Sequence, residues 1–276
     1  MTTLTPRRPS FPFDADLPAA WNPRLPEFAY AANSVSLLMP YAEPYFVKSV
    51  RAVIDQLDGD LKAQAEDYVR QEASHHAQHR RFNEVITRGH PFLKRLEGWM
   101  GGVYSWLGRT RSVKFNLAFA AGSEAIAYAL ARWTEPRMHE LFDDADPVAR
   151  DLYLWHLAEE VEHKSVAYDV FKALDGSKLR YTFTMVLSLH LLGLFTVLST
   201  YTMLISSKRI LHPMSWWHLT KWAFSMVWHV FPDLAVSTLP NHHPTDFTDP
   251  PYLTTWLGMF DEETASVPAL VGLDGR

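Results

Sequence analysis

The chain has 276 residues, 47% of them apolar, a formal net charge of −5 and no cysteine. This length supports a sizeable core in one domain with an appendage. The charge gives no electrostatic footprint for nucleic acid, and the absence of cysteine excludes disulfides and thiolate metal ligands. Because no apolar run of signal-peptide length follows Arg7 and Arg8, we expect a cytoplasmic protein.

Almost the whole chain shows helical periodicity. Residues 1–30 contain six prolines and predict an extended N-terminal arm. Apolar spacing predicts helices at about 33–57, 60–88, 111–135 and 147–173, with a shorter bridging element near 92–108. Pro40 and Pro44 are expected to make the first helix irregular. We therefore predict an all-α fold: a ferritin-like four-helix bundle with a dimetal core at 31–177, followed by a hydrophobic helical extension at 178–276.

Two of these helices carry the same short motif. Glu72 and His75 form a Glu-x-x-His in the second helix, and Glu160 and His163 form another in the fourth. Residues three apart lie on one helix face, so each pair can bind one cation. Ferritin-like dimetal carboxylate proteins use two such helices and one glutamate from each of the other two.

The other two helices supply those glutamates. Glu124 is the only formal charge in a seventeen-residue stretch from Phe115 to Ala131, where an ionised carboxylate would be costly to bury without a cation. Glu43 is the only acid between residues 28 and 54. The pattern Glu, Glu-x-x-His, Glu, Glu-x-x-His predicts two metal ions per chain, held by oxygen and imidazole nitrogen.

Further candidates surround this set. His156 lies on the same stripe as Glu160 and His163, and is either a direct ligand or a hydrogen-bond partner of one. His76 and His79 face roughly toward Glu72, and Glu159 could exchange roles with Glu160. These three are expected to support the ligands or to replace one of them.

Four stretches resemble the bacterial "predicted metal-dependent hydrolase" family. They read PYAEPYFVKSVR (40–51), QEASHHAQHRRFN (71–83), GSEAIAYALARW (122–133) and WHLAEEVEHKSVAYDV (155–170). The resemblance extends from about residue 30 to 260, including HHPTDF at 242–247. It implies six metal ligands in this sequence, namely Glu43, Glu72, His75, Glu124, Glu160 and His163. The fourth-helix motif is also similar to that of p-aminobenzoate N-oxygenases, which are di-iron enzymes of ferritin-like fold.

This ligand set leaves the chemistry open. Our first hypothesis is an O₂-dependent di-iron oxidase or oxygenase, which would need an electron donor and act on a lipophilic small molecule. The second is a metal-dependent hydrolase that uses a metal-bound hydroxide, and the third is iron storage or metal sensing without catalysis. Iron is the expected metal, with manganese and zinc as alternatives because they accept the same donors.

The C-terminal region adds a hydrophobic signal. Thr182 to Ser207 is 26 residues without a formal charge, long enough as a helix to cross a bilayer, and four tryptophans follow within Met214 to Phe231. We expect residues 182–231 to attach the protein to the inner membrane. The alternative is a fifth helix that packs on the bundle or forms a homodimer contact.

Overall fold

The computed structural model describes residues 4–88 and 90–267, and within them it is all-α, with no β-strand. The predicted fold class is confirmed, while the ferritin-like arrangement stays a prediction. In chain order the helices are α1 (Pro26–Ser36), α2 (Met39–Arg51), α3 (Gly59–Ile86), α4 (Pro91–Thr110), α5 (Val113–Thr134), α6 (Met138–Phe142), α7 (Pro147–His163), α8 (Val166–Leu174), α9 (Lys178–Ser206), α10 (Pro213–Ser237) and α11 (Pro251–Met259), with short 3₁₀ helices η1 (Ile54–Gln56), η2 (Glu135–Arg137) and η3 (Pro244–Asp246).

Two predicted helices are each divided. The prediction of one helix over 33–57 was wrong, because α1 ends at Ser36 and α2 begins at Met39. Pro40 has no N–H to donate back into a preceding turn, so it fits the first turn of a new helix. The predicted helix over 147–173 is likewise divided, into α7 and α8, immediately after His163. The bounds of α3, α4 and α5 agree with the predictions to within two residues.

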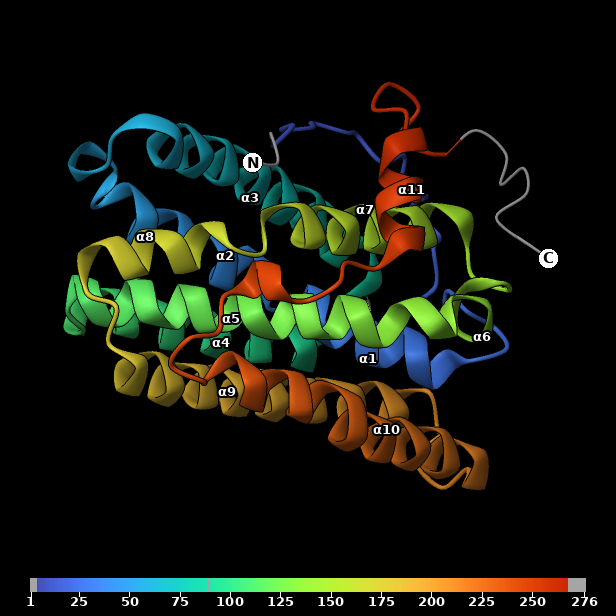
Figure 1. Ribbon diagram of the computed structural model, residues 1–276. Helices are drawn as coiled ribbons and strands as arrows, with labels where there is room; N and C mark the ends of the chain where they lie inside the picture. The colour runs from blue at the N-terminus through green and yellow to red at the C-terminus, as the bar shows by residue number, and fades with distance from the viewer. Residues whose placement is uncertain (1–3, 89, 268–276) are drawn as a thin grey trace.

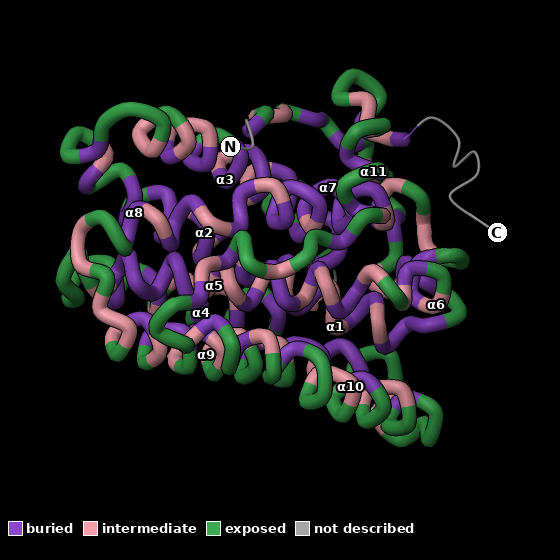
Figure 2. The backbone as a smooth tube through the Cα atoms, viewed as in Figure 1, coloured by how far each residue is buried: buried purple, intermediate pink, exposed green. Residues whose placement is uncertain are grey.

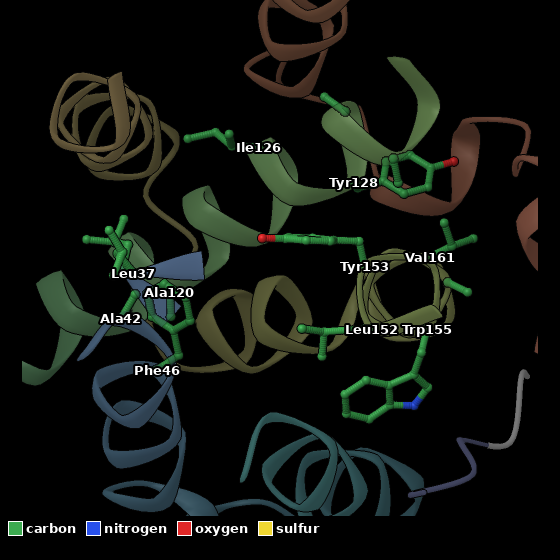
Figure 3. Packing of buried hydrophobic residues seen from close by; sticks show 14 of the residues in the cluster. Leu37, Ala42, Phe46, Ala120, Ile126, Tyr128, Leu152, Tyr153, Trp155 and Val161 are labelled. Carbon is green, nitrogen blue, oxygen red and sulfur yellow. The ribbon is translucent and has the colours of Figure 1, made fainter. Parts of the chain in front are cut away.

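The helices α2, α3, α5 and α7 surround the interior of the protein. In Figure 1, α5 runs across the middle, with α7 and α3 on one side of it and α9 on the other. Contacts join α2 to α3 and α5, and α7 to α3 and α5. Buried backbone is concentrated in this central layer (Figure 2). Close up, Ala42 and Phe46 of α2 gather with Ala120 of α5 (Figure 3), and the small alanines allow the helix backbones to approach.

The N-terminal arm contains no helix over residues 4–25 and contributes to the core; α1 begins at Pro26, inside the range predicted as extended. Phe11 is fully buried, with its ring centroid 5.6 Å from that of Trp155 on α7. Trp21 is 1% exposed and stacks at 5.3 Å on Tyr153. This packing fixes the path of the arm along α7, one of the helices that carry the metal motif.

The hydrophobic extension forms a hairpin against the bundle. One face of α9 packs on α5 and α1, and α10 packs on α5. Among the described residues α9 is the one helix long and apolar enough to cross a membrane, and 28% of its apolar window is buried. The boundary predicted at residue 178 coincides with the first residue of α9, and the division into domains stays a prediction.

A glycine controls the close contact between α5 and α9. A Cβ placed on Gly122 would lie 2.7 Å from the Cα of Met185, a backbone atom that cannot rotate away. We expect Gly122→Ala to destabilise the fold by about 1–3 kcal/mol in urea denaturation. In contrast, a Cβ placed on Gly193 of α9 would meet nothing within 4 Å, so Gly193→Ala is expected to stabilise by about 0.5–1 kcal/mol. Equal stabilisation by both substitutions would contradict this close contact.

Candidate metal centre

Four helices bring the predicted ligands to one buried place. Among the described residues, two groups could each hold a metal ion, with one donor atom per residue and all donors of a group within 4.8 Å of one another. One group comes from α3 and α7, and the other joins α2, α3 and α7. The members are Glu72, His75, Glu160 and His163 in the first group, and Glu43, His75 and His156 in the second.

The motif spacing explains this convergence. On α3, Glu72 and His75 are three residues apart, and the Glu72 Oε1 to His75 Nδ1 distance is 3.6 Å. From α7, His163 presents Nε2 at 3.3 Å from Glu72 Oε1, and Glu160 Oε1 lies 3.8 Å from His75 Nδ1. The predicted ligand Glu124 adjoins the groups, with Oε2 3.3 Å from Nδ1 of His163. All seven predicted ligand side chains thus lie together, and none of these residues is more than 9% exposed.

The donor atoms at the centre of this cluster have no hydrogen-bond partners among the described residues. Buried polar atoms are normally paired, since an unpaired one costs about 1–3 kcal/mol. Eight unpaired atoms in one cluster therefore require a common partner, and a cation suits carboxylate oxygens and imidazole nitrogens equally. The residues fit a bound metal. The atoms are Glu43 Oε1 and Oε2, Glu72 Oε1 and Oε2, His75 Nδ1, Glu124 Oε2, and His163 Nδ1 and Nε2.

The electrostatics of the cluster favour the same conclusion. Burial and then the neighbouring charge of Glu72 raise the pKa of Glu43 well above its ordinary value. Burial followed by the charge of Glu124 raises the pKa of Glu72 and of Glu160. Burial alone would lower the pKa of His75, but its carboxylate neighbours outweigh that effect and raise it to about 10. These carboxyl groups resist ionisation in a dry interior, and a bound cation would supply the positive charge that lets them ionise.

His75 is oriented by a contact on its far side. Its Nε2 lies 2.9 Å from Oε2 of Glu159, which leaves Nδ1 directed at the cluster. Glu159 in turn accepts a hydrogen bond from Arg7 at 3.0 Å. A carboxylate that accepts the outer N–H of a ligating histidine fixes its tautomer and increases its basicity. The geometry places Glu159 behind His75, supporting it, and a residue of the N-terminal arm completes the contact.

A hydrogen-bond chain reaches His156 from α3. Asn83 Nδ2 donates to the backbone carbonyl of Ser36 at 2.8 Å, so Asn83 Oδ1 is the acceptor that faces Ser36 Oγ at 2.6 Å. The Ser36 hydroxyl donates its one proton there, and therefore accepts from Nδ1–H of His79 at 2.7 Å. Neutral His79 then has a free lone pair on Nε2, which accepts from Nδ1–H of His156 at 2.6 Å.

This chain determines the tautomer of His156. With its proton on Nδ1, neutral His156 carries a lone pair on Nε2, which lies 2.8 Å from Glu160 Oε1 and 3.6 Å from Glu43 Oε1. Burial lowers the pKa of His156 well below its ordinary value and that of His79 to about 3, so both rings are neutral. A lone pair and a carboxylate oxygen approach this closely only with a proton or a cation between them. The Nε2 of His156 is therefore presented as a donor to the cluster.

Two remaining features of the sequence, His76 and the HHPTDF stretch, lie outside the ligand cluster. Nδ1–H of His76 donates to the backbone carbonyl of Glu72 at 2.9 Å, and His76 belongs to neither group of ligands among the described residues. Within the HHPTDF stretch, His243 contacts Asp169 at 2.8 Å and caps η3, which fastens the segment after α10 to α8.

Sequence reasoning missed several residues that contact the ligands or the residues that support them. Tyr68 donates to Oε1 of Glu124 at 2.8 Å and is fully buried. It lies one turn before Glu72 on α3, and that spacing could have identified it. For Arg7 and Ser36 no local signal exists, because each meets its partner only through the fold.

The comparisons with known proteins agree with this metal-binding geometry. The family described as "Predicted metal-dependent hydrolase" matches residues 5–247, which include every candidate ligand. No curated protein and no solved structure gives a significant match. The chain belongs to the family of predicted metal-dependent hydrolases.

Proposed function

We propose that the protein is an enzyme that holds two metal ions between α2, α3, α5 and α7 and uses them for hydrolysis. The observation that carries the proposal is the set of eight buried donor atoms without hydrogen-bond partners among the described residues. The family description supports hydrolysis as the reaction. Bound metal ions would supply Lewis acidity and a water of lowered pKa.

Charge supports two ions rather than one. Four buried glutamates contribute a charge of −4 when ionised, and two divalent cations neutralise it. One divalent cation would leave two uncompensated negative charges in the interior, at high cost. Glu159, a buried carboxylate behind this set, is paired with Arg7. The four glutamates are Glu43, Glu72, Glu124 and Glu160.

A cleft beside the ligand helix offers space for a substrate. It has a volume of about 710 Å³ and is lined by Val161, Glu162 and Lys164 near the end of α7, together with His243 and Asp169. This is the size of a small-molecule site. Val161 and Glu162 lie between the ligands Glu160 and His163 in sequence, so the cleft and the cluster border the same turn of α7.

O₂-dependent oxidation is the second candidate, and the enclosure of the cluster favours it. Every candidate ligand is at least nine-tenths buried, which suits a reactant as small as O₂. An electron donor and a lipophilic small-molecule substrate would complete this reaction. The sequence alone led us to rank oxidation first, with iron as the metal; the family match moves hydrolysis ahead of it.

Metal analysis, an anaerobic hydrolysis assay and an O₂-uptake assay separate the candidates. We expect about two metal ions per chain, hydrolysis of a panel of ester and phosphoester substrates without O₂, and loss of that activity on chelation. Failure to hydrolyse any of them, together with O₂ uptake by the reduced iron-loaded protein, would move the conclusion to oxidation. Absence of bound metal would overturn both, and many more than two ions per chain would indicate storage.

Two glutamates two residues apart on α7, Glu160 and Glu162, provide a matched pair of variants. Glu160→Gln is expected to lower both metal content and turnover, the latter by about 100-fold or more. Glu162 contacts Arg7 and Gln71 rather than the cluster, so Glu162→Gln should retain its metal content, which is the quantity compared because Glu162 also lines the cleft. Equal losses in the two variants would contradict the assignment of Glu160 as a ligand.

A further inference from the structure

The outward face of α9 is mostly apolar. Its exposed large apolar side chains recur every three or four residues, except between Val186 and Leu194, where the exposed side chain is His190. Leu179 (83% exposed), Phe183 and Ile205 (both 61%) are the most open. The inward face carries small hydroxyl residues that are fully or almost fully buried. A helix that faces water normally buries its apolar side chains and exposes its polar ones, and α9 does the reverse. The remaining outward side chains are Val186, Leu194, Val197 and Tyr201, and the inward ones are Thr184, Ser188, Ser199 and Thr200.

Two neighbouring helices extend the face. On α10, Trp217 (62% exposed), Phe224 (65%) and Trp228 (75%) follow one another at helical spacing. On α4, Trp99 and Trp106 are half-exposed, and the Trp99 ring packs at 5.0 Å against Phe195 of α9. The exposed backbone of α9 and α10 forms the lower border of the molecule in Figure 2. We call the outward side of α4, α9 and α10 the apolar face.

The charges around the apolar face have one predominant sign. Residues 91–114 and 178–239 contain ten lysines and arginines and two acids, in a chain whose formal net charge is −5. Of those acids, Asp233 is paired with Arg132 at 2.8 Å and Glu97 is partly buried. Four of the basic residues are paired with acids outside these ranges, namely Lys114 and Arg180 with Asp175, Arg209 with Glu27 and Lys221 with Glu140. The other six still outnumber Glu97, and they are Lys94, Arg95, Arg109, Arg111, Lys178 and Lys208. A positive face would repel a second copy of itself, whereas an anionic lipid surface attracts it at about 1 kcal/mol per basic residue near the surface.

Contacts on the inner side of the hairpin decide its orientation. Arg209, between α9 and α10, donates two hydrogen bonds to the buried Glu27 of α1, at 2.7 and 2.9 Å. Lys221 of α10 binds Glu140 at 2.6 Å. Because α9 is held along the bundle by these contacts and by α5, one side of it faces protein throughout.

We propose that the apolar face docks on an anionic membrane surface, with α9 and α10 lying in the plane of the interface rather than crossing the bilayer. Exposed tryptophans favour the level of the lipid headgroups, and the buried area of an in-plane helix together with basic residues sets the strength of binding. The membrane attachment expected for residues 182–231 would then be to one leaflet, although residues 182–207 are long enough as a helix to cross a bilayer. It does not depend on the reaction catalysed at the metal centre.

Vesicle flotation with the full chain tests the proposal. We expect the protein to float with vesicles of phosphatidylcholine and phosphatidylglycerol, less with phosphatidylcholine alone, and less at high salt. Phe224→Glu/Trp228→Glu should weaken partitioning by about 10-fold or more, because it removes two exposed aromatic side chains and adds two negative charges. Both positions are exposed, so the melting temperature and metal content should remain those of the wild type.

The matched control adds the same charge elsewhere. Gln56 and Ala63 are exposed near the start of α3, away from α9 and α10, and Gln56→Glu/Ala63→Glu is expected to float like the wild type. Equal loss in both double variants, or no flotation of the wild type, would overturn the proposal. A stable dimer in solution that Phe224→Glu/Trp228→Glu dissociates would overturn it in favour of a contact between two copies.

Discussion

Replacing Glu43 with methionine is expected to stabilise the metal-free protein and to reduce the stabilisation that metal ions confer on the wild type. Both carboxylate oxygens of Glu43 are buried without a hydrogen-bond partner among the described residues, and burial raises the pKa of this group well above its ordinary value. Methionine has a similar volume and no charge. A buried polar group without a hydrogen-bond partner costs about 1–3 kcal/mol, so its removal should stabilise the metal-free protein by about that amount.

In the presence of metal ions, Glu43→Met should instead make the protein less stable than the wild type. A ligand that binds only the folded protein at 1,000 times its Kd stabilises it by about 4 kcal/mol, and the variant should lose most of this increment. We would measure melting temperatures with and without added Fe(II), Mn(II) or Zn(II), together with metal content. The expected pattern is a higher melting temperature without metal and a smaller rise with it.

The control for this substitution lies on the surface. Glu84 is an exposed glutamate on α3, so Glu84→Met should leave both melting temperatures close to those of the wild type. If Glu43 served only as a structural acceptor, Glu43→Met would lower the stability of the metal-free protein. That result would remove Glu43 from the ligand set.

Replacing His79 with phenylalanine is expected to weaken metal binding by about 10- to 100-fold, the usual effect of removing a group that orients a ligand. His79 accepts from Nδ1–H of His156 at 2.6 Å and so keeps Nε2 of that ring free to bind. Without this acceptor, His156 can adopt the other tautomer or rotate, and Nε2 is no longer a fixed donor. Competition with a chelator of known affinity measures the change without any activity assay.

His76 supplies the matched control on the same helix. It contacts the backbone of Glu72 and stands outside both ligand groups, so His76→Phe should retain the affinity of the wild type. A second variant, Ser36→Ala, removes the acceptor of His79 Nδ1–H and should give a smaller loss in the same direction. An unchanged metal affinity in His79→Phe would mean that His156 does not bind metal through this orientation.

Much of the metal centre could be predicted from the sequence, because the interval between two residues on a helix determines whether their side chains lie on the same face. Glu72 with His75, and Glu160 with His163, share a face through the three-residue interval alone. The isolation of Glu124 within an apolar helix indicated a buried carboxylate before any contact was known. The same local rule predicted α3, α4 and α5 to within two residues.

Other features depend on partners that are distant in the chain. Nothing local in the sequence could separate His76 from His79, since the difference is made by Ser36 and His156 on other helices. Arg7 reaches Glu159 only because the arm packs beside α7. The donor set alone also cannot distinguish hydrolysis from oxidation, because the same oxygen and nitrogen atoms suit several metals and reactions.

The sequence by itself therefore determined the helical class, the four ligand-bearing segments and the hydrophobicity of the C-terminal region, all of which follow from composition and helical periodicity. Only the tertiary structure decided which groups support each ligand, because hydrogen bonds such as Arg7 to Glu159 join residues 152 positions apart. It also decided which side of α9 faces outward. Periodicity defines the faces of a helix, but packing against α1 and α5 selects the one that is covered.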